Sequence, residues 1–241
     1  MRIVLLGPPG AGKGSLAFLI HKRLGVAHVS TGEIFRHEIR RKSALGVRVQ
    51  RYVANGRLVP TSLVVQVMAA QLGRKRLANG FVLDGFPRTQ GQAAGLDRVL
   101  TRRHHPLDGA VYLTSPASLL VRRLSGRRVC ARCGANYHIR TMKPKRAGRC
   151  DNCHGALIIR KDDQPATIRR RLRLDHANAR PLLAYYKRHG RLYNINGVGH
   201  IEQAYARAVK LFTRKQWICH RVGHDPNHLS GIRRRRIRLR R

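Results

Sequence analysis

The segment GPPGAGKGS, residues 7–15, places four glycines and a lysine directly after a short apolar run. A strand that leads into a glycine-rich loop and then a helix lets backbone N–H groups surround phosphate oxygens at the helix N-terminus. Lys13 would then bring a positive charge to the β- and γ-phosphates. A usual phosphate loop has Ser or Thr directly after the lysine, whereas here Gly14 stands there and Ser15 follows. We therefore predict a phosphate site in which Ser15 supplies the hydroxyl group.

Four cysteines have the spacing of a metal site. Two Cys-x2-Cys pairs, separated by sixteen residues, comprise Cys130, Cys133, Cys150 and Cys153. In a cytosolic chain such pairs indicate metal ligands before disulfides. Four thiolates favour Zn²⁺ and leave no open coordination position, so we expect a structural zinc. Reduced free cysteines, two disulfides and an iron–sulfur centre are the alternatives.

The charge of the chain is one-sided. Fifty Lys and Arg against eleven Asp and Glu give a formal net charge of +39 and a pI near 11.8. Such a surface attracts polyanions, although a basic composition without any such partner is the alternative. No run reaches the roughly 18 uncharged apolar residues of a membrane span, and residues 1–6 already have the pattern of a buried strand. We therefore expect a soluble, cytoplasmic protein without a leader peptide.

Strand and helix patterns alternate along the chain and would position these groups. Short apolar runs predict buried strands at 2–7, 80–89, 109–115 and 192–199. Apolar residues at helical spacing predict helices at 15–25, 30–41, 61–73, 166–190 and 200–212, and those at 30 and 61 open on Ser/Thr caps. Between 126 and 163 glycine, cysteine and polar residues replace this pattern, which indicates a small inserted subdomain. The alternation predicts an α/β fold with a parallel sheet and helices on both faces.

The phosphate loop resembles that of adenylate kinases, in which Gly and then Thr usually follow the lysine. Later segments strengthen the resemblance, and LDGFPRTQGQA at 83–93 is the most specific of them. The chain departs from the usual pattern at Ser15, Glu33 and Arg57, where the family has Thr, Asp and often Lys. The resemblance covers roughly residues 1–213 and includes STGEIFR (30–36), GRLVP (56–60), RRLSGRRV (122–129) and RKDDQPATIRRR (160–171).

The resemblance implies a role for each matching residue, with Arg123 packed on the ATP adenine and Gln92 against the AMP adenine. The catalytic cations would be Lys13, Arg88, Arg127, Arg160 and Arg171, since guanidinium groups suit phosphate. The ATP site would comprise Gly10, Ala11, Gly12, Lys13, Gly14, Ser15, Arg123, Arg127, Asn136, Tyr137 and Gly199. The AMP site would comprise Thr31, Arg36, Arg57, Leu58, Val59, Gly85, Phe86, Pro87, Arg88, Gln92, Arg160 and Arg171. Asp84 and Glu33 would contact magnesium indirectly.

The implied architecture is a P-loop NTPase-like parallel sheet flanked by helices. Its core would be residues 1–29, 60–125 and 164–213, with an AMP-binding helical subdomain at 30–59 and a zinc-binding lid at 126–163. The implied reaction is reversible phosphoryl transfer from ATP to AMP, giving two ADP, in a monomer that uses Mg²⁺ with ATP and Zn²⁺ in the lid. A kinase for another nucleoside monophosphate, a GTP-dependent AMP kinase, and a nucleic-acid- or ribosome-associated protein on the same fold are the alternatives.

Residues 214–241 extend beyond the resemblance. They contain ten Lys and Arg against one Asp and end in GIRRRRIRLRR. We expect a basic tail that the reaction does not need and that contacts nucleic acid or an anionic surface; a tail without any partner is the alternative. Cys219, His220, His224 and His228 could suggest a second metal site, but Pro226 interrupts a helical arrangement and we interpret the segment as polar tail.

Overall fold

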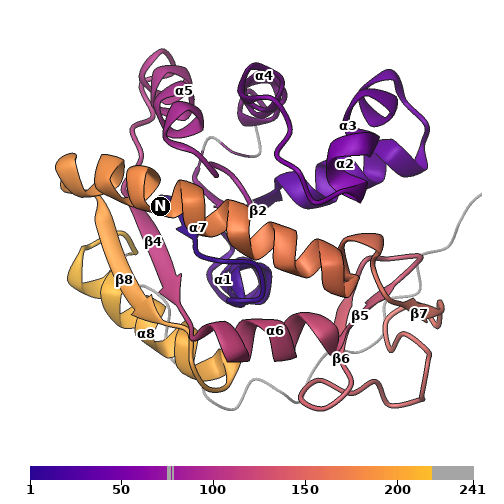
Figure 1. Cartoon of the computed structure of the whole chain (residues 1–241). Coiled ribbons are helices and arrows are strands. Elements are labelled where there is room, and N and C mark those ends of the chain that lie inside the picture. Colours follow the sequence, from indigo (N-terminus) through magenta and orange to yellow (C-terminus); the bar gives the residue numbers. More distant parts are fainter. Residues whose placement is uncertain (75–76, 78, 219–241) are drawn as a thin grey trace, which may run out of the picture.

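The computed structural model describes residues 1–74, 77 and 79–218. Its centre is a parallel sheet with strand order β2-β3-β1-β4-β8, covered by helices on both faces (Figure 1). The strands are β1 (Arg2–Leu6), β2 (Ala27–Ser30), β3 (Phe81–Asp84), β4 (Gly109–Thr114) and β8 (Leu192–Asn196). The predicted α/β fold with a parallel central sheet is confirmed.

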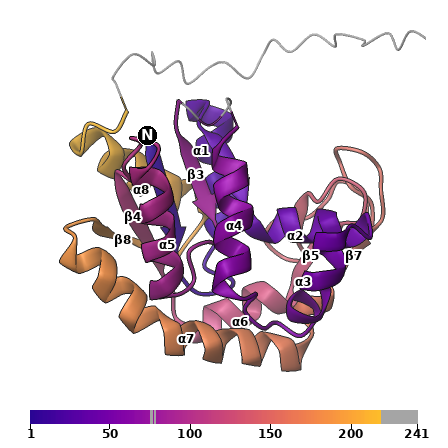
Figure 2. The same cartoon turned by 90° about the horizontal axis from the view of Figure 1, so that it is seen from above.

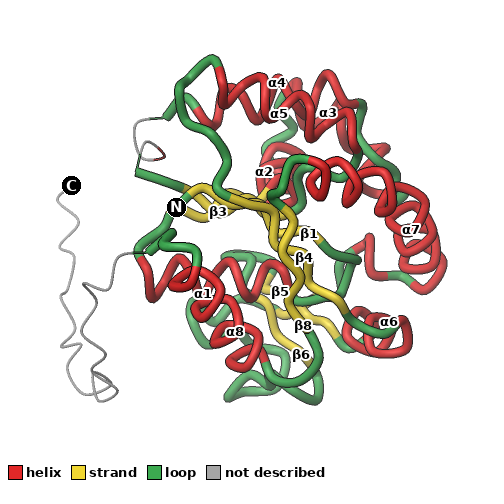
Figure 3. The backbone as a smooth tube through the Cα atoms, turned by 90° about the vertical axis from the view of Figure 1, so that its left-hand side faces the viewer, coloured by secondary structure: helices red, strands yellow, loops and turns green. Residues whose placement is uncertain are grey.

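Two hydrophobic cores lie on opposite faces of this sheet. In β1, Ile3 and Leu5 join one core while Val4 and Leu6 join the other. Because strand side chains alternate between faces, a strand buried on both sides has a continuous apolar run. Figure 3 shows the sheet between the two helical layers. One layer contains α1 (Lys13–Leu24) and α8 (Ile201–Arg214), and the other contains α4 (Thr61–Leu72), α5 (Gln90–Thr101) and α7 (Pro165–Arg188).

Two helices were predicted to begin with a Ser/Thr cap, and one of them does. Ser30 precedes α2 (Thr31–Arg40), and its Oγ accepts a hydrogen bond from the Glu33 N–H, as expected. The expected Ser/Thr cap of α4 is wrong, because Pro60 occupies the cap position without a side-chain hydrogen bond and Thr61 is the first helical residue. The proline ring already fixes φ for the entry into this helix. The sequence patterns did not predict β2, α5, α3 (Ala44–Ala54) or α6 (Ala117–Ser125).

Two insertions lie at one end of the molecule. Helices α2 and α3 pack together, and a separate antiparallel sheet is formed by β5 (Arg127–Cys130), β6 (Asn136–His138) and β7 (Leu157–Ile158). Figures 1 and 2 both place these insertions on the same side, away from α5 and β8. A short 3-10 turn, η2 (Lys161–Asp163), leads from the small sheet into α7. The boundaries 30–59 and 126–163 stay predictions.

The described chain continues past α8 and stays packed on the body. The Trp217 ring makes an edge contact with Tyr193 at 5.1 Å between centroids and lies 5.8 Å from the Phe212 ring. A Cβ at Gly109 would approach the Trp217 ring to 2.3 Å, so only glycine fits there. The start of the predicted tail therefore contributes to the core. The remainder, with the Cys219 and histidine group and the arginine-rich end, lies outside the described residues.

None of the described helices is long and apolar enough to cross a membrane.

Replacing Trp217 by Ala should destabilise the protein. The half-buried indole contacts two rings and closes over Gly109, so its loss leaves a cavity at the edge of the sheet. We expect the free energy of unfolding to fall by about 2–4 kcal/mol in chemical denaturation. Arg214→Ala, at an exposed neighbour, should change it by less than about 0.5 kcal/mol. Equal unfolding midpoints for the Trp217 variant and the parent would contradict this packing.

Candidate active site

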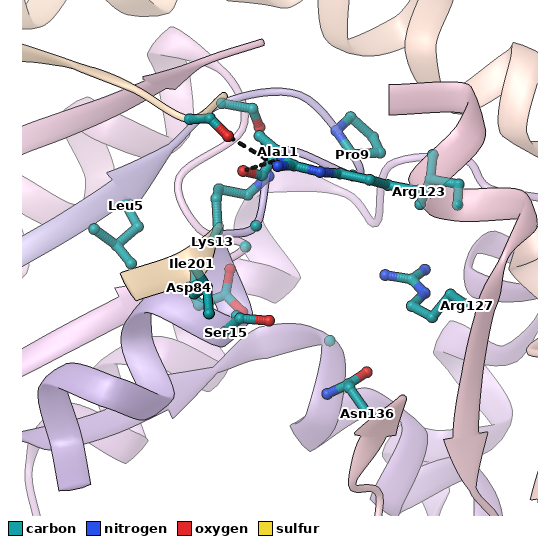
Figure 4. Close-up of a pocket in the computed structure, with 18 of the residues that line it drawn as sticks. Leu5, Pro9, Ala11, Lys13, Ser15, Asp84, Arg123, Arg127, Asn136 and Ile201 are labelled. Carbon is teal, nitrogen blue, oxygen red and sulfur yellow. Dashed lines mark hydrogen bonds between the residues drawn. The ribbon is translucent and has the colours of Figure 1, made fainter. Parts of the chain in front are cut away.

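A cleft of about 1470 Å³ lies where β1, β3 and β4 end. Its walls come from the glycine-rich loop, the segment after β3, the small β5–β7 sheet, and one face of α7. Figure 4 shows Lys13, Ser15 and Asp84 on one wall, with Arg127 and Asn136 across from them. Ligands of open parallel sheets bind outside the carboxyl ends of the strands. The cleft therefore lies where the fold class places a ligand.

The glycine-rich loop presents a cation and a bare helix end to the cleft. Gly12 begins α1 with φ +99° and without a side-chain cap, and no acidic residue lies in the first turn. The first N–H groups of the helix are then available to an anion. The Lys13 Nζ donates to the carbonyls of Gly7 at 2.5 Å and Pro8 at 2.9 Å. Burial lowers the pKa of Lys13 to about 8, which phosphate oxygens would reverse.

Asp84 explains why glycine follows the lysine. A Cβ at Gly14 would lie 3.2 Å from the Asp84 Oδ2, so a larger side chain would press on this carboxylate. The hydroxyl moves one position along, to Ser15, which also lines the cleft. Carboxylate and hydroxyl oxygens are ligands that Mg²⁺ accepts, directly or through water. The residues present therefore fit a magnesium ion that accompanies a bound polyphosphate.

His28 is a neighbour of Asp84 that the sequence patterns did not identify. Its Nε2 lies 3.9 Å from the Asp84 Oδ2, and both side chains line the cleft. Burial alone would raise the pKa of Asp84, but His28 and the charge of Lys13 together lower it. Asp84 is therefore a carboxylate at neutral pH, which a metal contact requires.

One buried carboxylate ties the small sheet to α7. The Asp163 side chain is fully buried, and it accepts hydrogen bonds from Arg127 through Nε at 2.7 Å and through Nη2. Arg171 donates to the same carboxylate at 3.1 Å and to Asp162 at 2.9 Å. Burial would raise the pKa of Asp162, but Arg171 and its neighbours lower it. The bidentate contact fixes the direction of the Arg127 guanidinium group, and Arg171 is held through Nη1 by both aspartates.

Arg160 lies directly before η2 and is close to the charges of Arg127, Asp162 and Asp163. Its Nη2 donates to the Asn136 Oδ1 at 2.8 Å. Burial, together with the charges of Arg36 and Arg127, lowers the pKa of Arg160 to about 9. Positive charge is thus crowded at this end of the cleft, and an anion would relieve the repulsion.

Arg123 connects the phosphate loop with the turn after β8. Its guanidinium donates to the carbonyls of Gly197 and Gly199 at 3.0 Å each, and to Ala11 at 3.4 Å (Figure 4). The resemblance assigns Arg123 and Gly199 to the adenine of ATP, and the structure brings them together. The other residues expected at the ATP site also line the cleft, namely Gly10, Gly12, Lys13, Gly14, Ser15, Arg127, Asn136 and Tyr137.

The residues expected at the AMP site divide into two groups. Arg88 lies in the cleft, where its Nε donates to the Gly85 carbonyl at 2.8 Å. Gln92 is only 2 % exposed, and its Oε1 accepts from the Arg88 backbone N–H at 2.8 Å. The other residues expected at the AMP site that line the cleft are Arg36, Leu58, Gly85, Pro87, Arg160 and Arg171, and Glu33, expected near magnesium, also lines it. Those that do not line it in this conformation are Thr31, Arg57, Val59, Phe86 and Gln92.

Asp175 is a second group that the sequence analysis missed. It lines the cleft one helical turn after Arg171, and the charges of Lys13 and Arg88 act on it. Burial raises the pKa of Asp175 against these cations. Its i, i+4 spacing from Arg171 was a usable signal once α7 was known to face the cleft.

The four spaced cysteines converge in the small sheet. Their sulfur atoms all lie within 4.8 Å of one another, with 3.4 Å between the Sγ atoms of Cys130 and Cys153 and 3.5 Å between those of Cys133 and Cys150. Tetrahedral zinc with Zn–S bonds near 2.3 Å needs sulfurs about 3.8 Å apart. None of the four forms a disulfide in this structure, and their arrangement fits a metal.

Tyr137 links the cysteines to the cleft. Its hydroxyl lies 3.4 Å from the Cys150 Sγ and accepts from the Asp151 N–H at 2.7 Å, while its ring lines the cleft. The phenol lowers the pKa of the Cys150 thiol to about 6. Hydrogen bonds from a second layer of residues orient metal ligands and raise metal affinity, so Tyr137 would support a bound ion and the cleft wall together.

The sequence of this chain is similar to those of known proteins. The family model described as adenylate kinase matches residues 5–191. An adenylate kinase of Clostridium botulinum (strain Langeland) is 44% identical over 214 residues, which is 89% of this chain and 99% of that protein. An adenylate kinase of Moorella thermoacetica is 45% identical over 197 residues, 82% of this chain and 91% of that protein.

Replacing Cys150 and Cys153 by Ser should abolish metal binding. We expect one zinc per chain in the parent and none in the variant by elemental analysis, with a lower melting temperature, because a small sheet gains much of its stability from the metal. Tyr137→Phe should keep the metal but release it to a chelator roughly tenfold faster. Tyr193→Phe, in the main sheet, is the control. A metal-free parent would refute this site. Identical rates of metal release from the parent, Tyr137→Phe and Tyr193→Phe would refute the supporting role of Tyr137.

Proposed function

Since this chain belongs to the adenylate kinase family and so transfers a phosphoryl group reversibly between ATP and AMP to give two ADP, we propose that its cleft holds the two nucleotides with their phosphates meeting between Lys13 and Arg88. The observation that carries this assignment is the position of both cations on one cleft, close enough that the charge of Arg88 acts on Lys13. The adenine of each nucleotide would then lie at an opposite end of the cleft.

The donor site would be built around the helix end of α1. Lys13 and the loop N–H groups would hold the phosphates of ATP, while Arg123 would pack on its adenine. The turn at Gly199 would contact the base through its backbone. The support is that Arg123 already donates to the carbonyls of Gly197 and Gly199, so a planar cation and the turn form one surface. A flat guanidinium group stacks well on an aromatic base.

The acceptor site would be built around Arg88 and Arg36. Both line the cleft, and the Arg88 guanidinium is oriented by the Gly85 carbonyl. Two guanidinium groups would bind the AMP phosphate through several hydrogen bonds. Gln92 would read the adenine, which requires it to release the Arg88 N–H or to use its amide nitrogen. The 56–60 segment would contribute backbone contacts, as the family resemblance implies.

The transfer step needs little proton chemistry. The AMP phosphate is already an anionic nucleophile, so catalysis is positioning and charge stabilisation. The charge on the equatorial oxygens of the transferred phosphoryl group would be neutralised by Arg127, Arg160 and Arg171. Asp163 orients two of these arginines, Arg127 and Arg171. Adenylate kinases use Mg²⁺ with ATP, and the bound ion would neutralise negative charge on the phosphates. Asp84 would hold it through water, with Glu33 and Ser15 nearby in the cleft.

Water must be excluded, or ATP would be hydrolysed. We infer that residues 30–59 and 126–163 close over the core as two moving parts, because closure of such segments excludes water from the reacting phosphates. The contacts of Arg160 with Asn136 and of Arg127 with Asp163 would carry the motion of the lid to the phosphates. Closure would also bring Thr31 and Arg57 nearer to the AMP.

Finer assignments follow the same line. The metal of the four cysteines would be Zn²⁺ in a structural role, because four thiolates leave no coordination position for substrate. We propose a monomer that works in the cytoplasm. Contact of the 214–241 segment with nucleic acid or another anionic surface stays a prediction, and residues 219–241 lie outside the described structure.

Lys13→Ala and Arg88→Ala should each remove most of the activity. Loss of one group that stabilises transferring charge costs on the order of 10²-fold or more in turnover. The assay couples ADP formation to a visible signal, with ATP or GTP as donor and AMP, GMP, CMP or UMP as acceptor. We expect AMP to be the preferred acceptor, and Arg102→Ala, at an exposed site, to match the parent. Full turnover in both cleft variants, or preference for another monophosphate, would overturn the assignment.

The affinity for ATP should depend on the charge of Lys13. Burial lowers its pKa to about 8 in the free protein, and bound phosphate raises it again. The affinity for ATP is therefore highest while Lys13 is protonated. It falls as the pH rises through about 8, by up to about tenfold per pH unit. Calorimetric titrations from about pH 7 to about pH 10 would measure this. Lys13→Arg keeps its charge throughout, so its profile should be flat; an equally steep profile would assign the effect to another group.

A further inference from the structure

The long helix α7 carries a row of basic side chains on the face away from the cleft. Arg169, Arg173, Arg180 and Lys187 are spaced by four, seven and seven residues and are all exposed. At about 100° per residue these positions fall within about 40° of one line along the helix. His176 lies in the same line. We call the four cations the outer basic row; Figure 2 shows α7 along one margin of the molecule.

The outer basic row has no internal counter-charge. Within the part of the chain that the structure describes, none of its four side chains has a hydrogen bond or ion pair with a protein acceptor. The acidic residue of α7, Asp175, faces the cleft instead. Other arginines of the same helix are used internally, since Arg171 binds Asp162 and Arg170 donates to the Asn55 carbonyl. The row is therefore free to meet an external anion.

We propose that the outer basic row binds the phosphodiester backbone of nucleic acid. From the first to the last cation it spans eighteen residues, or about 27 Å at 1.5 Å per residue. One strand of a duplex presents about eight phosphates over that length, at 3.4 Å each. Exposed cations along the outer face of α7, which curves in Figure 2, can contact the phosphates that face the helix without reading the sequence. The binding is thus non-specific and strongly salt-dependent.

The surface of α7 favours nucleic acid over a lipid bilayer. Binding to a membrane interface uses large apolar side chains beside the cations. The described residues with large exposed hydrophobic side chains lie on other elements and not on α7. Between the cations of the row stand small residues, Ala177 and Ala184, which leave the charges accessible but offer little to insert.

The row and the cleft occupy opposite faces of one helix. Arg171 and Asp175 point into the cleft, whereas Arg173 and Arg180 are exposed on the other side. A nucleic acid on the row leaves the entrance of the cleft free, so the chain can bind a polynucleotide while it turns over nucleotides. This inference does not depend on the proposed roles of the cleft residues.

The test compares two full-length variants with the same loss of charge. One carries Arg173→Gln, Arg180→Gln and Lys187→Gln in the outer basic row. The matched control carries Arg74→Gln, Arg102→Gln and Lys210→Gln, which are exposed and lie outside α7 and outside residues 30–59 and 126–163. Fluorescence anisotropy measures the Kd for a labelled duplex DNA, a duplex RNA and a single-stranded RNA from about 50 to about 200 mM salt. Vesicles of neutral lipid with and without anionic lipid form the membrane arm, and ADP formation reports on folding.

We expect the row variant to bind duplexes roughly 10- to 100-fold more weakly, with a salt slope shallower by about 2–3, since each lost phosphate contact removes about 0.9. The control should change Kd by less than about threefold, and both variants should form ADP like the parent. Equal loss in both variants would show that only net charge matters and would overturn the proposal. So would unchanged binding by the row variant, or a loss confined to anionic vesicles. If the parent forms no ADP, that result contradicts the proposed function and leaves the proposal for the outer basic row unaffected.

Discussion

The buried Asp163 carboxylate is the interaction on which the site depends. It accepts from Arg127 of the small sheet and from Arg171 of α7, so a single group joins the small sheet, η2 and the long helix. A buried carboxylate left without partners costs several kcal/mol, and so do buried arginines without an anion. Neither the carboxylate nor the two cations could therefore be buried here alone. Their mutual contact fixes where the phosphate-binding charges point.

The carboxylates do not balance the charge of the cleft. Lys13 and Arg160 have lowered pKa values because burial and neighbouring cations disfavour their charged forms. Asp84 and Asp175 offset part of this, the first beside His28 and the second beside Lys13. The phosphates of two nucleotides would supply the missing negative charge. Bound phosphates would thereby relieve the repulsion among these cations.

Local patterns in the sequence predicted the groups that lie close together along the chain. The glycine-rich loop, β1 and the two cysteine pairs each depend on spacings of a few residues, and the structure has them where expected. The strand β2 was missed because its four residues mix polar and apolar types, and α6 because its apolar face is short. His28 and Asp175 face the cleft only through tertiary packing. The tight space at Gly14 is likewise non-local, since the carboxylate nearest to it belongs to Asp84, seventy residues later.

The most direct test of this account is a crystal structure of the full chain with AMP and a non-hydrolysable ATP analogue bound together. The account predicts that the γ-phosphate lies within hydrogen-bond distance of the Lys13 Nζ and that the AMP phosphate contacts the Arg88 guanidinium. Arg127 and Arg171 should keep their contacts with Asp163 while the lid closes over the phosphates. Phosphates bound away from Lys13 and Arg88, or an AMP molecule outside the segment between Arg36 and Gln92, would contradict it.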